Sequence, residues 1–166
     1  MSAFLPLGEM LRRRHRGLQT RMAVLEFDRR VRRDRVVQLA EELVAHATVE
    51  QLVLYPYAEE LLGIRDLSLE IDRSLDALLG VIGGIDDDMT FAGAMARLTA
   101  SFERHVDGDE MGLLPMVEVL GAPDQIVRME HTIEEFERTL ATSRTDEPWF
   151  LPDAEREVVA RSRGKN

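Results

Sequence analysis

Two histidines and two carboxylates of this chain lie at spacings that place them on the apolar faces of helices. Residues three or four apart share one face of a helix. His46 and Glu50 continue an apolar stripe that begins at Leu39, and His105 and Asp109 continue a second stripe with the same spacing. Both pairs are therefore predicted to point into the interior of a helical bundle.

His15 lies between Leu11 and Leu18 on a third stripe of this kind. A buried carboxylate is costly unless a cation or a metal ion compensates it. One inward histidine is usually a hydrogen-bonded core residue, but three with two carboxylates exceed the ordinary partners of a small core. We therefore predict a metal site, and imidazole with carboxylate favours iron, manganese or zinc. His131 lies beside the stripe of its helix and is left out.

The two His–carboxylate pairs belong to one pattern that occurs twice, 59 residues apart. The shift superimposes five pairs of positions, which are His46 and His105, Glu50 and Asp109, Pro56 and Pro115, Glu59 and Glu118, and Leu61 and Leu120. The repeat predicts that two helices present the same set of groups.

The helical spacing of apolar residues predicts five helices. Their approximate ranges are 7–27, 36–62 with a bend at Pro56, 66–82, 89–106 and 126–140. Gly63 is predicted to end the second helix, Asp66 to cap the third, and the acidic run 86–88 to cap the fourth. The expected fold is all-α: an antiparallel four-helix bundle over residues 1–145, with the fifth helix outside it. Residues 146–166, including Trp149, are expected to be an extension that is packed on the bundle or frayed.

The composition excludes several classes of site. The chain of 166 residues has no cysteine, which excludes disulfides and thiolate ligands. The net charge is −10, although residues 1–35 carry +6, so we do not expect nucleic-acid binding. No apolar run reaches membrane-spanning length and no signal peptide is evident, so we expect no membrane partner and a cytoplasmic location.

The residues around the two pairs resemble the hemerythrin family, specifically the bacterial hemerythrin-like (HHE cation-binding) domains. The resemblance runs from about His15 to Leu120 and rests on His15 and on two motifs. These are H-A-T-V-E followed by L-Y-P, and H-V-D-G-D-E followed by L-L-P. It implies an up-down-up-down bundle with a non-heme di-iron centre, in which Glu50 and Asp109 bridge two irons that His15, His46 and His105 cap. A single iron or zinc ion is the alternative.

The third predicted helix departs from the family pattern because it contains no histidine. Family members usually supply one or two there, at positions that read Ser68 and Asp72 in this chain, with Glu70 nearby. Either Asp72 or Glu70 replaces the imidazole, or one metal position is weak or empty. Asp72 as a solvated surface acid is the simpler alternative. Tyr55, near the end of the ligand face, is expected to pack with its hydroxyl in water.

The resemblance implies a protein that binds or reacts with a small oxidant, namely oxygen, peroxide or nitric oxide. A carboxylate-rich site favours oxidase or peroxide-consuming chemistry over reversible storage. Two alternatives are an oxygen-activating oxidase with an organic substrate and a metal-poor module that binds a regulatory partner. The sequence leaves the choice between carrier, sensor and enzyme open, together with the oligomeric state.

Overall fold

Helices account for nearly all of the described chain. The computed structural model describes residues 6–27 and 32–142. The elements in chain order are α1 (Leu7–Phe27), α2 (Arg32–Val49), η1 (Glu50–Leu54), α3 (Tyr55–Leu62), α4 (Leu69–Gly83), α5 (Asp88–Gly108), η2 (Asp109–Leu113), α6 (Leu114–Leu120) and α7 (Pro123–Thr142). The predicted all-α class is confirmed. The predictions for Trp149 and residues 146–166 lie outside the described residues.

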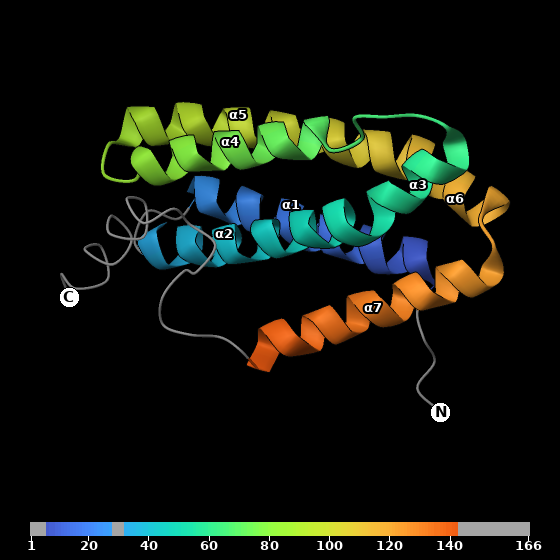
Figure 1. Ribbon diagram of the computed structural model, residues 1–166. Helices are drawn as coiled ribbons and strands as arrows, with labels where there is room; N and C mark the ends of the chain where they lie inside the picture. The colour runs from blue at the N-terminus through green and yellow to red at the C-terminus, as the bar shows by residue number, and fades with distance from the viewer. Residues whose placement is uncertain (1–5, 28–31, 143–166) are drawn as a thin grey trace.

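Four long helices surround one apolar core. Figure 1 shows α4 and α5 as one pair and α1 and α2 as another, and α2 contacts α4 while α1 contacts α5. The core side chains come from all four helices, and Leu11, Leu39, Leu78 and Leu98 are among those with almost no exposed surface. Helix α7 lies along the outside against α1, α2 and η1, as predicted for the fifth helix. No described helix has both the length and the apolar character needed to cross a bilayer.

The predicted helix ends are partly correct. Gly63 ends α3 in the left-handed conformation, with φ of 66°, and Asp87 caps α5 by accepting a hydrogen bond from the Thr90 backbone N–H at 2.7 Å. Asp66 does not cap the third helix. Its φ is 65°, and the N-terminal residue that precedes α4 is Ser68. Asp66 therefore lies in the turn between α3 and α4, and not at the start of the helix as the sequence predicts.

The fourth predicted helix is longer than expected. We predicted an end near Val106, but the chain stays helical from Asp88 through α5, η2 and α6 to Leu120. Pro115 lies in the first turn of α6, where a missing backbone N–H is tolerated.

Two π-helical turns interrupt the ligand-bearing helices at equivalent places. The Tyr55 backbone N–H donates to the carbonyl of Glu50, and the Leu114 N–H donates to that of Asp109, so both bonds span five residues. Pro56 follows the first turn and Pro115 the second. A proline removes the donor of an α-helical bond and clashes with the carbonyl four residues earlier, and a wider turn relieves this clash. The widened turns therefore begin at the two carboxylates that the sequence repeat singled out.

Gly63→Ala is expected to lower the free energy of unfolding by about 1 kcal/mol, because only the left-handed backbone opposes the substitution. A Cβ at Gly63 would meet no atom within 4 Å. Gly83→Ala is the matched control, since a Cβ there is also unobstructed but φ is not positive. Urea denaturation of the metal-free protein measures both, and equal stability of the two variants would contradict the assignment.

Candidate metal centre

The centre is built around Glu50, whose side chain is fully buried at the start of η1. His15 Nε2 lies 3.4 Å from Glu50 Oε1, and His46 Nε2 lies 3.2 Å from the same oxygen. His105 Nε2 lies 3.2 Å from Oε2. Three helices, α1, α2 and α5, thus aim one imidazole nitrogen each at a single carboxylate.

The separations between these donors suit one metal ion. The Nε2 atoms of His46 and His105 are 3.1 Å apart, and one donor atom from each of His15, His46, Glu50 and His105 can be chosen so that all lie within 4.8 Å of one another. An ion with bonds of about 2.0–2.1 Å to four tetrahedral donors separates neighbouring donors by about 3.3 Å. The residues present therefore fit a single ion with three imidazoles and one carboxylate.

Burial sets the protonation of the centre. Desolvation lowers the pKa of His105 to about 3 and that of His46 well below its usual range. The three imidazoles are therefore neutral at neutral pH and available as ligands. Desolvation also raises the pKa of Glu50 to about 8 and that of Asp109 to about 9, so both carboxyl groups are protonated at neutral pH when no metal is bound.

Asp109 lies beside the four donors and is not one of them. Its carboxyl group is buried at the start of η2 and interacts with Glu50. The Tyr55 hydroxyl donates to Glu50 Oε2 at 3.1 Å and lies 3.4 Å from Asp109 Oδ2. The expectation that this hydroxyl is in water is wrong, because Tyr55 is only 3% exposed and its hydroxyl bonds the central carboxylate.

Glu110 is a residue of the centre that the sequence pattern does not predict. It follows Asp109 inside the π-helical turn η2, and its Oε1 lies 2.8 Å from Nδ1 of His15. A carboxylate that accepts the outer N–H of a metal-ligating histidine fixes the ring and its tautomer. Glu110 therefore orients His15 toward Glu50.

Helix α4 supplies no group to the cluster. Asp72 is exposed and accepts a hydrogen bond from the Gln51 side chain at 2.6 Å. Glu70 pairs with Arg73 and with Arg104 at the surface. The structure therefore places both proposed substitutes for the missing histidine outside the cluster.

The inner face of α4 carries other side chains. Ser68 precedes this helix, which turns Ile71, Ser74 and Leu78 toward the core. The Ser74 hydroxyl donates to Ser101 at 3.2 Å. The side of the bundle interior that α4 forms therefore carries apolar and hydroxyl groups.

Phe102 closes the centre on another side. The ring is fully buried, and its centroid lies 5.3–6.0 Å from those of His15, His46 and His105. An aromatic ring at this position keeps water away from the donors.

Comparison with known families agrees with this geometry. The model of the hemerythrin HHE cation-binding domain matches residues 7–117. The chain belongs to this family. No curated protein and no solved structure matches it significantly. The hemerythrin match ends inside α6, so α7 lies beyond it.

Glu110→Gln is expected to weaken metal affinity about 10- to 100-fold, because His15 loses the acceptor that orients it. Competition with a chromogenic chelator measures the affinity, and circular dichroism checks that the helices persist. Asp107→Asn is the control, since it removes an exposed carboxylate from the same helical segment. Equal affinities of the two variants would contradict the role of Glu110.

Metal affinity is expected to rise with pH above neutrality. Because the raised pKa values leave the Glu50–Asp109 pair protonated in the metal-free protein, an ion that needs ionised Glu50 must displace protons. Calorimetric titration with Zn²⁺ in buffers of different ionisation enthalpy counts them. We expect about one proton per ion near pH 7, released from Glu50, and Asp109→Asn should release the same number because Asp109 is not a ligand and keeps its own proton. No proton release from the wild type would show that Glu50 is already ionised in the metal-free protein.

Proposed function

We propose that the protein is a hemerythrin-type metalloprotein that holds an ion at His15, His46, Glu50 and His105 and binds or reacts with a small oxidant. The proposal is supported above all by the donor geometry, since four buried donors lie within 4.8 Å of one another. Three neutral imidazoles around one buried carboxyl group favour a metal ion, which would let Glu50 ionise without water.

We propose iron as the functional ion, since imidazole and carboxylate donors suit it and it changes oxidation state. A bound iron would supply the electron that an oxidant such as oxygen, peroxide or nitric oxide accepts. The chain's own residues would orient and shield it. Glu110 holds His15, Tyr55 holds Glu50, and Phe102 excludes water.

We further propose that one ion, rather than the two expected from the resemblance, is bound tightly. Asp109 has a carboxylic acid and a tyrosine hydroxyl as its neighbours, and α4 brings no imidazole to the second position. Weak binding of a second ion between Glu50 and Asp109 would be the remaining form of the di-iron expectation. We also propose that the four long helices alternate in direction, up-down-up-down, and that the protein is cytoplasmic.

The test is the metal content and the absorption spectrum of protein purified from iron-supplemented cells. We expect about one iron per chain and an absorption band that bleaches on anaerobic reduction and returns in air. His46→Ala and His105→Ala should each lose the iron, because each removes one of four ligands. His131→Ala is the control, as His131 is exposed and outside the cluster.

Other outcomes distinguish the alternatives. Two tightly bound irons per chain would support the di-iron centre that the family resemblance implies. One zinc with no visible band would leave a structural metal site and favour a regulatory module. Retention of iron by His46→Ala would overturn the ligand assignment.

A further inference from the structure

The three histidines of the cluster differ at the ring nitrogen that faces away from Glu50. Nδ1 of His15 lies 2.8 Å from Glu110 Oε1, and Nδ1 of His105 lies 3.4 Å from the Tyr55 hydroxyl. Nδ1 of His46 is buried and has no hydrogen-bond partner among the described residues. An imidazole that binds a metal through Nε2 carries its proton on Nδ1, which then needs an acceptor. His46 lacks the acceptor that such a histidine requires.

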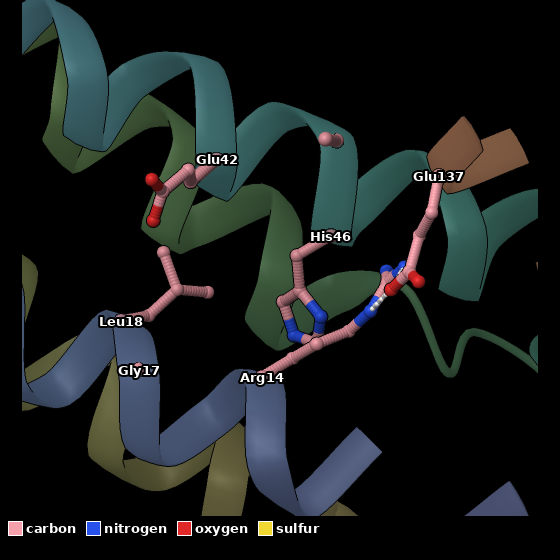
Figure 2. A pocket seen from close by; sticks show the side chains of 7 residues that line it. Arg14, Gly17, Leu18, Glu42, His46 and Glu137 are labelled. Carbon is pink, nitrogen blue, oxygen red and sulfur yellow. Dashed lines mark hydrogen bonds and ion pairs between the residues drawn. The ribbon is translucent and has the colours of Figure 1, made fainter. Parts of the chain in front are cut away.

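A pocket opens beside this ring. It has a volume of about 260 Å³ and lies between α1, α2 and α7, with His46 in its wall (Figure 2). Gly17 leaves part of its lining without a side chain, since a Cβ there would meet no atom within 4 Å. The pocket is several times larger than the roughly 30 Å³ that one water occupies in the liquid. A small molecule in the pocket would lie beside the His46 ring, and it would reach the covered Nδ1 only by taking the place of a neighbouring side chain.

Arg14 gives this pocket its cation. Its Nε and Nη2 both donate to Glu137 of α7, a pair drawn with a dashed line in Figure 2. A guanidinium has five N–H donors, so three remain for another acceptor. The side chain of Arg14 is 16% exposed and that of Glu137 is 49% exposed, so Glu137 can leave for water more easily than Arg14 can. Glu42, the other carboxylate of the lining, pairs with Arg21.

We infer that this pocket binds a small carboxylate-type anion that accepts the His46 Nδ1–H and pairs with Arg14 in place of Glu137. The inference rests on the proposed metal site, because ligation through Nε2 fixes the proton on Nδ1. An anionic acceptor makes the imidazole a stronger donor to its ion, so the anion tunes the centre through His46. Glu137 comes from a helix beyond the family match and acts as the competitor for Arg14.

The experiment uses the full chain loaded with zinc, which has no redox chemistry, and formate as the probe. Nuclear magnetic resonance of ¹⁵N-histidine protein follows the ring N–H signal of His46 during a formate titration. We expect this signal to shift and saturate. Arg14→Gln should weaken formate binding about tenfold, because it removes the cation. Glu137→Gln should tighten binding up to about fivefold, because an exposed ion pair no longer competes.

The matched control is the exposed ion pair between Arg16 and Glu9 on the same helix. Arg16→Gln and Glu9→Gln change the net charge of the protein by the same amounts as Arg14→Gln and Glu137→Gln, but they should leave formate affinity unchanged. Zinc content and circular dichroism establish that each variant is folded and loaded. If Arg14→Gln does not fold, the Glu137→Gln result alone tests the competition.

Four outcomes would overturn the inference. If formate does not shift the His46 signal in zinc-loaded protein, water remains the acceptor of the His46 Nδ1–H. A shift of equal affinity in folded Arg14→Gln would show that Arg14 does not hold the anion. A change of the His46 signal in formate-free Glu137→Gln would identify Glu137 as the acceptor. The same titration of protein loaded with Co²⁺ in place of zinc reports on the metal directly. A formate-dependent change of its absorption spectrum that is identical in wild type and Arg14→Gln would show that formate binds the metal.

Failure of the metal proposal gives a different result. Absence of stoichiometric zinc binding would overturn the proposed function before any formate is added. Normal zinc binding with no effect of formate would overturn the pocket inference and leave the metal site in place.

Discussion

The rest of the structure depends on keeping one carboxyl group, Glu50, buried away from solvent. Three neutral imidazoles surround it, and the cost of desolvation outweighs the favourable charge of Arg14, so its pKa is raised. A buried charge of this kind is tolerated only with a metal ion or with a proton. Helices α1, α2 and α5 must therefore converge on one point, and the apolar side chains on either side of each histidine hold them there. The stability of the bundle and its ability to bind metal are two results of the same packing.

The π-helical turns solve a local problem that this convergence creates. An α-helix turns only every third or fourth residue inward, so a regular helix would not turn Tyr55 to the same face as Glu50, five residues earlier. A turn closed by five-residue bonds aligns Tyr55 with Glu50 and lets Asp109 and Glu110 both reach inward. Such turns are rare within helices, and the prolines that follow them make the regular α-helix unfavourable in both places.

The sequence predicts the parts of the site that follow ordinary helical periodicity. His15, His46, Glu50, His105 and Asp109 are buried where spacing of three and four places them. Glu110 and the buried position of the Tyr55 hydroxyl do not follow from this spacing, because both depend on a widened turn. The recurrence of proline six residues after each carboxylate was the available signal. Glu70 and Asp72 were proposed as ligands from the family pattern, but the inner face of α4 is set by Ile71, Ser74 and Leu78. The continuation of α5 into α6 is not predicted either, because it passes through the widened turn η2.

The centre is asymmetric because α4 provides none of its four donors, and this affects the chemistry that the centre can support. Three helices hold the donors, and the fourth packs against them with apolar and hydroxyl side chains. The chemistry of a bound ion would then be adjusted mainly by what lies behind its ligands. Glu110 behind His15 is a carboxylate, Tyr55 behind His105 is a neutral hydroxyl, and the space behind His46 is a pocket. Of the three, only the last has an occupant that can change without refolding the bundle, so His46 is the ligand through which a solute in solution can act on the ion.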